Sequence, residues 1–122
     1  MKIKTITIPA NTASYSLGLT ETEKAGAKFV SITSAAVTIK GTHASYGSFT
    51  GTGTFSYQSF YVENIGNGTS SSSVNLSSTI SGLKVTSNIN ISSNTYSLSY
   101  TNFSNPSSVV VPARTITIYY FG

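Results

Sequence analysis

The stretch 83–91, LKVTSNINI, decides the fold class of this chain. Apolar residues fill four of its five odd-numbered positions, and Lys, Thr or Asn fills every even-numbered one. A period of two residues is the pattern of a β-strand that buries one face and exposes the other. The stretch therefore predicts a strand whose inward side chains are Leu83, Val85, Ile89 and Ile91.

Similar short segments lie on both sides of this strand. Alternation is clear at 2–8, where Pro9 ends the strand, and again at 74–80 and 95–101. Nine or ten short strands separated by turn residues are typical of an all-β sandwich or barrel. Further strands are expected at 13–19, 28–33, 35–40, 55–63, 108–111 and 114–121.

The segments between these strands carry cap and turn signals. Thr20 and Glu23 have the spacing of a capping box and Gly26 suits a helix end, so one helical turn is expected over 20–26. Four glycines in 41–54 predict a long connection or a bent edge strand. Two further segments are expected to be irregular, 66–73 as a loop and 102–106 as a turn.

The composition agrees with an all-β domain. Val, Ile, Thr, Tyr and Phe account for 51 of the 122 residues, whereas Ala, Leu, Glu, Lys, Gln, Arg and Met account for 25. A chain of this length is the size of one domain and can bury about two-thirds of its unfolded surface. We expect a single domain over 1–122, a two-sheet antiparallel β-sandwich of jelly-roll or immunoglobulin-like topology.

Charged residues are scarce. They make up 8% of the chain, against about 25% in an average soluble protein, and none lies between Lys84 and Arg114. Ser, Thr and Asn supply 50 residues, so the predicted surface is one of hydroxyls and amides. Low charge weakens the repulsion that keeps small domains apart. The net charge of +4 reflects few acids rather than a basic cluster, so nucleic-acid binding is not expected.

Titratable and metal-binding residues are too few to favour catalysis. The chain has no Asp or Cys and a single histidine, which excludes disulfides, thiolate-bound metals and aspartate pairs. Glu21 and Glu23 fit the start of the helical turn, where carboxylates interact favourably with the helix dipole. His43, Ser45 and Glu63 have the residue types of a hydrolytic triad but lack the glycine and the helix of a nucleophile elbow. Calcium held by Glu63 and carbonyl oxygens is an alternative without a loop motif. We expect a non-enzymatic protein that needs no cofactor.

Two strands are apolar on both faces. In 55–63 and 114–121, aromatic or aliphatic residues occupy both parities, whereas a strand of a solvent-exposed sandwich normally buries one face only. The outer face is then covered by a loop, by another subunit, or by a sugar ring stacked on tyrosine. The candidate interface residues are Tyr57, Phe60, Tyr61, Tyr119, Tyr120 and Phe121.

Modification and location are constrained weakly by sequence. Acceptor patterns for N-linked glycans begin at Asn67, Asn75, Asn90 and Asn102, and they are used only where a host attaches glycans. The N-terminus alternates like a strand and lacks the apolar block of a classical signal peptide. No apolar run approaches the roughly 20 residues of a membrane span. If the protein works outside a cell, we expect that it left the cell by particle assembly or cell lysis rather than through a classical signal peptide.

In size, all-β patterning, retained Met1 and uncharged Ser/Thr/Asn surface, the chain resembles small virion structural proteins. These are the capsid, decoration and tail or fibre proteins of phages and archaeal viruses. The resemblance implies a non-enzymatic subunit that forms a homo-oligomer, or assembles with other structural subunits, on a virion or another extracellular surface. The alternative is a carbohydrate-binding or adhesin module that holds a glycan on Tyr and Asn side chains. An assembling subunit is expected to be an oligomer in solution, and a binding module a monomer.

Overall fold

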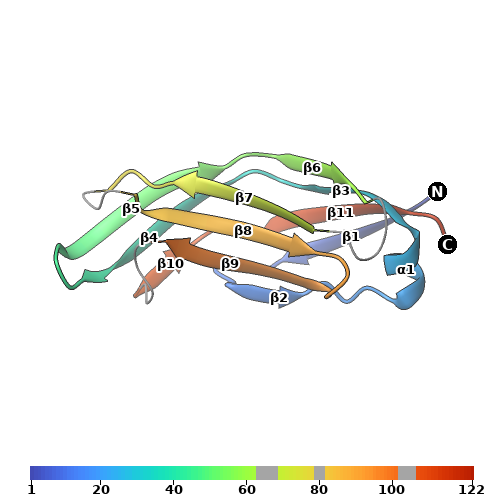
Figure 1. The fold of residues 1–122 in the computed structure, drawn as a ribbon, viewed down its shortest axis with the longest axis horizontal. Coiled ribbons are helices and arrows are strands. Elements are labelled where there is room, and N and C mark those ends of the chain that lie inside the picture. Colours follow the sequence, from blue (N-terminus) through green and yellow to red (C-terminus); the bar gives the residue numbers. More distant parts are fainter. Residues whose placement is uncertain (63–68, 79–81, 102–106) are drawn as a thin grey trace.

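The computed structural model describes residues 1–62, 69–78, 82–101 and 107–122 and confirms an all-β chain (Figure 1). Its described part contains eleven strands and one short helix, α1 (Glu21–Gly26). The strands are β1 (Lys2–Ile8), β2 (Ser14–Ser16), β3 (Ala27–Ile32), β4 (Ala35–His43), β5 (Gly47–Phe55), β6 (Gln58–Tyr61), β7 (Thr69–Asn75), β8 (Lys84–Asn90), β9 (Thr95–Thr101), β10 (Ser108–Val110) and β11 (Arg114–Tyr120).

The strands form three antiparallel sheets, an arrangement compatible with a β-sandwich. Their strand orders are β1-β11-β3-β6, β10-β4-β5 and β2-β9-β8-β7. The first two sheets are joined directly, because the chain passes from one to the other through very short links. Only Thr33 and Ser34 separate β3 from β4, and only Ser56 and Tyr57 separate β5 from β6. The third sheet lies across from both (Figure 1).

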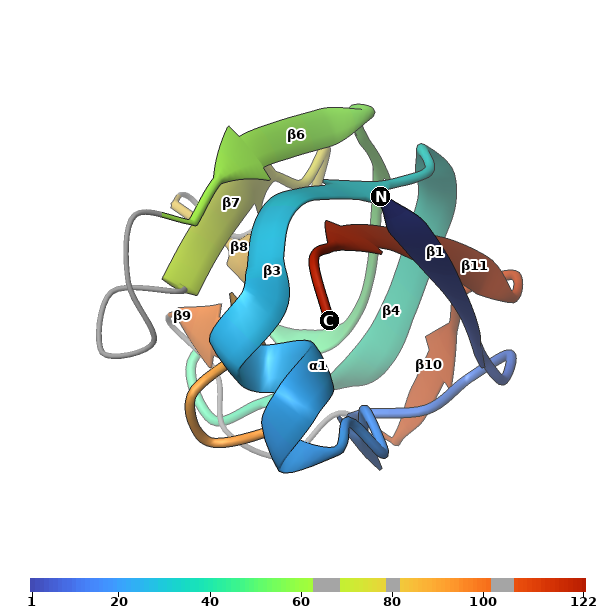
Figure 2. The ribbon, with the colours of Figure 1, turned by 90° about the vertical axis from the view of Figure 1, so that its right-hand side faces the viewer.

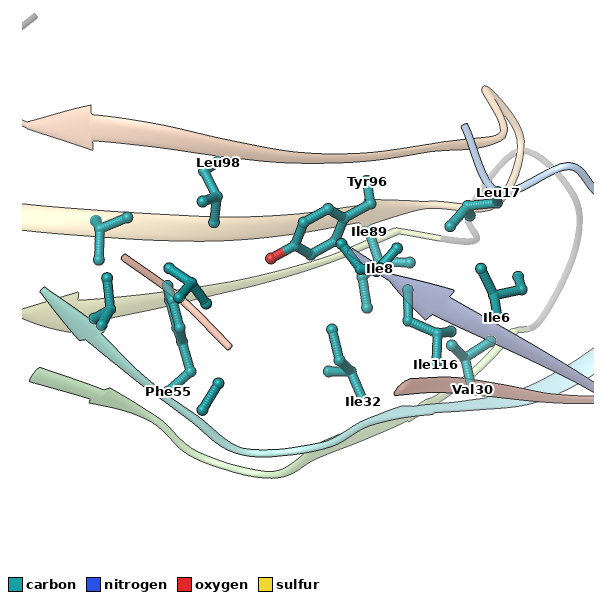
Figure 3. Packing of buried hydrophobic residues seen from close by; sticks show 14 of the residues in the cluster. Ile6, Ile8, Leu17, Val30, Ile32, Phe55, Ile89, Tyr96, Leu98 and Ile116 are labelled. Atoms are coloured by element: carbon teal, nitrogen blue, oxygen red, sulfur yellow. The ribbon is translucent and has the colours of Figure 1, made fainter. Parts of the chain in front are cut away.

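The hydrophobic core fills the space between the β2-β9-β8-β7 sheet and the other two. Figure 3 shows Tyr96 and Leu98 pointing from β9 toward Ile32, Phe55 and Ile116 on the opposite side. Seen end-on, the strands surround this core, and α1 crosses the end of the molecule where both termini lie (Figure 2). Because inward positions recur at every second residue, each described strand longer than three residues contributes apolar or small side chains to the core.

One buried cation joins the sheets. Arg114, at the start of β11, is 1% exposed, and its Nη2 and Nε donate to the Thr33 carbonyl at 2.7 and 3.1 Å. Its Nη1 donates to Ser87 Oγ at 3.2 Å and to the Tyr96 hydroxyl at 3.4 Å, both on the opposite sheet. The guanidinium lies 4.8 Å from the centre of the Phe55 ring. Neutral oxygens and a ring face therefore replace a carboxylate as its partners.

Helix α1 forms as its sequence predicts. Thr20 accepts from the Glu23 amide at 3.1 Å, and the Glu23 carboxylate accepts from the Thr20 amide at 2.8 Å, which completes the capping box. Glu23 also contacts Lys4 Nζ at 3.2 Å, so the helix is tied to β1. At the other end, Gly26 accepts from the Phe121 amide at 2.9 Å, in a contact with no room for a Cβ. The chain end after β11 is thereby held against α1.

The glycine-rich segment 41–54 is not a long connection, because β4 runs on to His43 and pairs along nine positions with β5. The alternative expectation, an edge strand, agrees with the place of β5 at the edge of the β10-β4-β5 sheet. The glycines at 51 and 53 point inward, between Phe49 and Phe55. A Cβ on Gly51 would lie 2.7 Å from Leu83 Cδ2, so the missing side chains make room for the neighbouring leucine and valine. This extra strand is why the described strands number eleven rather than nine or ten.

Other strand boundaries also differ from the prediction. Of the expected loop 66–73, residues 69–73 belong to β7, where outward serines bond across to β8, and residues 66–68 lie outside the described ones. The expected aromatic strand 55–63 is interrupted at Ser56 and Tyr57. The strand expected at 13–19 shortens to β2, and the turn expected at 102–106 lies outside the described residues. Low serine propensity for strands was overridden by cross-strand pairing in β7.

Candidate functional site

The strand register places one apolar row across the outer face of the β1-β11-β3-β6 sheet. Ile3 lies opposite Tyr119 in the β1–β11 pair. Tyr119 lies opposite Phe29, and Phe29 lies opposite Tyr61. One chain neighbour of each ring is buried, namely Ile118, Val30 and Val62, so alternation turns the three rings away from the core. Ile3 is itself exposed and lies on the same side as Tyr119, its partner in the pair. Ile3, Tyr119, Phe29 and Tyr61 are called the aromatic row below.

The rings of the aromatic row contact one another, and the rings of Phe29 and Tyr119 are half-buried. The ring centroids of Phe29 and Tyr61 lie 5.2 Å apart with the rings edge-on, and those of Phe29 and Tyr119 lie 5.7 Å apart. Yet Tyr61 is 78% exposed and Ile3 is 60% exposed. With Met1, the three rings line a shallow hollow of about 320 Å³. Ring-to-ring packing orders this surface before any partner arrives.

A row of hydroxyls lies beside the aromatic row on the same face. Thr5 lies opposite Thr117 in the β1–β11 pair. Thr117 lies opposite Ser31, and Ser31 lies opposite Ser59. Each of these residues is two positions along its strand from a member of the aromatic row, or about 7 Å. The eight positions hold apolar and hydroxyl side chains and no charge. These eight side chains therefore form a neutral surface, of which one half is the aromatic row and the other half carries hydroxyls.

The outer face of the β2-β9-β8-β7 sheet is different in kind. Every outward position of β7, β8, β9 and β2 carries Ser, Thr or Asn, except Lys84. Neighbouring strands bond through these side chains. Ser71 Oγ donates to Asn88 Oδ1 at 2.7 Å, and the hydroxyls of Ser73 and Thr86 lie 2.8 Å apart. This surface is called the hydroxyl face, and it holds no aromatic side chain among its described positions.

The structure separates the six residues predicted as an interface. Tyr61 and Tyr119 belong to the aromatic row, and Tyr57, 60% exposed, lies just before β6. Phe60 lies opposite the buried Val30 and packs against the core. The two others lie at the end of β11: Tyr120 is half-buried opposite Lys2 and Ala27, and Phe121 is exposed beside α1.

Three members of the outward surface escaped the sequence reading: Phe29, Ile3 and Met1. Phe29 was grouped with Val30 and Ile32 as a residue of one apolar strand. Its parity was the available signal, because Val30 and Ile32 share one face and Phe29 must take the other. That Phe29 meets Tyr61 and Tyr119 depends on which strands pair, and a single sequence does not show strand order.

Of the residues tested for catalysis, His43 makes a contact within its own turn. His43 Nδ1 accepts from the backbone amide of Ser45 at 2.9 Å within the β4–β5 turn. The His43 ring centroid lies 5.0 Å from that of Tyr46. Gly47, with φ of 73°, completes this tight turn in a conformation that glycine adopts readily. Glu63, the third residue of the tested triad and the calcium candidate, lies outside the described residues.

Glu21 and Glu23 both lie in the first turn of α1, as the sequence predicts. The backbone amide of Thr20 is the main cause that lowers the pKa of Glu23 from its ordinary 4.5. Burial acts in the opposite direction, and Lys4 adds to the lowering. Glu21 is exposed and lies 3.2 Å from Lys24 one turn later. These carboxylates stabilise the helix and its contact with β1.

The predicted glycan acceptors have unequal surroundings. Asn75 is exposed at the end of β7. Asn90 is half-buried, and its Oδ1 accepts from Ser92 Oγ at 2.8 Å and from the Ser93 amide at 3.0 Å in the turn before β9. Asn67 and Asn102 lie outside the described residues. Of the two acceptors that can be placed, Asn75 is the accessible one.

The described part of the chain shows neither a metal-ligand cluster nor a membrane-spanning helix. Within residues 1–62, 69–78, 82–101 and 107–122, no three His or Glu side chains gather as metal ligands do. No helix in that part of the chain is long and apolar enough to cross a bilayer. No protein-family model matches the chain, and neither a curated protein nor a solved structure matches it significantly. Function must therefore be argued from the surfaces themselves.

Proposed function

We propose that this protein is a non-enzymatic structural subunit that self-assembles through the aromatic row as a virion surface component. The observation that carries the proposal is the continuous row of Ile3, Tyr119, Phe29 and Tyr61 on one sheet face. Its two ends, Ile3 and Tyr61, are exposed, and the two middle rings are half-buried. Contiguous exposed apolar surface on a small domain marks a site of contact. Tyrosine and phenylalanine are enriched in the buried centres of protein interfaces.

The neutral surroundings of the aromatic row favour a second copy as the partner. Two identical faces meet in a symmetric dimer, so the side chains of one face must tolerate one another across the interface. A face of rings and hydroxyls does so without opposing like charges. The low overall charge of the chain, 8%, reduces long-range repulsion between copies in the same way. Capsid, decoration, tail and fibre subunits, which the chain resembles, assemble from many identical copies.

The proposed architecture is a two-sheet sandwich with the outer strands of a jelly roll. The β1-β11-β3-β6 and β10-β4-β5 sheets form one bent layer in this proposal, and β2-β9-β8-β7 forms the other. Support comes from nested pairing of the chain ends, because β1 pairs with β11 and β2 with β9. The two layers are also bonded where Thr52 of β5 pairs with Ser77, two residues after β7. Such rigid layers suit a building block.

The test is the mass of the protein in solution, measured by analytical ultracentrifugation over a wide concentration range. The wild type is expected to sediment as an oligomer, and Tyr61→Ser as a monomer. Tyr46→Ser is the matched control, since Tyr46 is 56% exposed but lies in the β4–β5 turn, away from the aromatic row. It should assemble as the wild type does. A monomeric wild type that binds a glycan through Tyr61 would favour the carbohydrate-binding or adhesin alternative instead.

A further inference from the structure

A second hollow lies on another sheet and has different chemistry. It measures about 330 Å³ and is lined by the ends of β4 and β5 and by the residue before β10. Figure 1 shows the β4–β5 hairpin at the end of the molecule opposite α1 and both termini. Its polar lining residues are Lys40, Thr42, Ser48, Thr50 and Ser107. This hollow is called the β4–β5 pocket.

Strand register fixes the arrangement of these polar groups. Lys40 lies opposite Thr50, and the next outward pair is Thr42 opposite Ser48, so the four side chains form a block on one face. Ser107 is held beside them because its amide and its Oγ both donate to the Lys40 carbonyl, at 2.8 and 3.1 Å. Three hydrogen-bonded chain segments therefore supply one lysine and four hydroxyl side chains to the lining of the β4–β5 pocket.

The ammonium of Lys40 is the charge of this pocket. The ion pairs in the described part of the chain use Lys4 with Glu23 and Lys24 with Glu21. None of the described residues that line the pocket is acidic. Lys40 is therefore available to an anion from solution, with hydroxyls that can both donate and accept hydrogen bonds around it.

We propose that the β4–β5 pocket binds an acidic sugar, with the sugar carboxylate at Lys40 and the sugar hydroxyls at the surrounding Thr and Ser side chains. The pairing of one cation with several hydroxyls matches a ligand that has one negative charge and several hydroxyls. A volume of about 330 Å³ lies at the lower end for ligand sites, which fits one sugar unit rather than a chain.

This proposal does not depend on assembly through the aromatic row. The two surfaces lie on different sheets and share no residue. A protein that assembles but binds no sugar would overturn only the proposal for the β4–β5 pocket. A monomer that binds glucuronic acid at Lys40 would overturn only the assembly. A subunit with both properties would be able to attach its assembly to an acidic glycan.

The test is titration of the ¹⁵N-labelled wild type with glucuronic acid, followed by the amide shifts in its NMR spectrum. Saturable shifts are expected at Gly41, Thr42 and Ser48, with weaker binding as salt is added. Lys40→Gln should weaken binding by about tenfold or more, which corresponds to 1.4 kcal/mol. Lys28→Gln is the matched control, because it removes one positive charge from an exposed site on β3 and should leave binding unchanged.

Two further probes separate this ligand from its closest alternatives. Glucose tests the need for the carboxylate, and inorganic phosphate tests the need for the sugar. Both should bind at least about tenfold more weakly than glucuronic acid if charge and hydroxyls act together. Equal binding of glucose, or equal binding of phosphate, would overturn the assignment to an acidic sugar. Shifts that are absent from the β4–β5 pocket, or that persist in Lys40→Gln, would overturn the site.

Discussion

The two outer faces of this molecule obey the same alternation and carry opposite chemistry. On the hydroxyl face, outward positions are Ser, Thr and Asn that bond to each other, as Ser71 does to Asn88. On the β1-β11-β3-β6 sheet, the equivalent positions include the aromatic row, whose rings contact each other but leave Tyr61 largely exposed. Period-two patterning makes a strand, but the choice of outward residue decides whether its outer face is polar or apolar.

The largest effect is expected where the layers behind the two faces are joined, at Arg114. Arg114→Ala leaves the Thr33 carbonyl, Ser87 and Tyr96 without their donor and opens a cavity beside Phe55. The free energy of unfolding should fall by about 3–5 kcal/mol, measured by urea denaturation. Arg114→Lys should lose less, since it keeps the charge but not the planar fork of donors. A change below about 1 kcal/mol in Arg114→Ala would show that the guanidinium does not hold the sheets together.

A smaller loss is expected from filling the space that glycines leave behind β5. In Gly51→Ala the new methyl would lie 2.7 Å from Leu83 Cδ2 and 3.2 Å from Leu76 Cβ. Overpacking should lower the free energy of unfolding by about 1–3 kcal/mol, measured by thermal and urea denaturation. Thr54→Ala, an exposed change on the same strand, is the control and should stay within about 0.5 kcal/mol. A stabilised Gly51→Ala would mean that the core here has room to spare.

The comparison of the two faces can be broken directly by placing a charge on each. Tyr61→Lys should abolish oligomers while changing the free energy of unfolding by about 0.5 kcal/mol or less, since Tyr61 is 78% exposed. Ser71→Lys puts the same charge on the hydroxyl face and should leave the oligomer intact. Light scattering after gel filtration measures both variants. Loss of assembly in Ser71→Lys alone would move the contact to the hydroxyl face.

The smallest effect is expected in the pH dependence of the free energy of unfolding. The described side-chain carboxylates, Glu21 and Glu23, both lie in α1, and Glu23 contacts β1 through Lys4. Because the folded pKa of Glu23 is lowered, its stabilisation is present above about pH 4.5 and is lost as pH falls through the folded pKa. Glu23→Gln keeps a capping side chain but no charge. Its unfolding free energy should vary less with pH in that acid range than that of the wild type, which denaturant titrations at several pH values would show.

Much of the fold followed from local pattern, and the site followed only in part. Strands such as β1 and β8 and the capped helix α1 were predictable, because alternation and a Thr20–Glu23 pair act within a few residues. The strand β7 was not, because its serines depend on bonds to β8. The aromatic row was predictable only in part. The alternation of residues along each strand indicated that Tyr61 and Tyr119 face outward. Their contact through Phe29 depends on the pairing of β11, β3 and β6. Strand order is set by long-range packing, which local propensity does not encode.

The most direct test of the central claim is hydroxyl-radical footprinting of the wild type at low and at high protein concentration, read out by mass spectrometry. If copies cover the aromatic row, oxidation of Tyr61 and Met1 should slow as concentration rises. Oxidation of Tyr46, in the β4–β5 turn, should stay constant. Equal oxidation of Tyr61 at every concentration at which the protein is stable and folded would contradict assembly through this face.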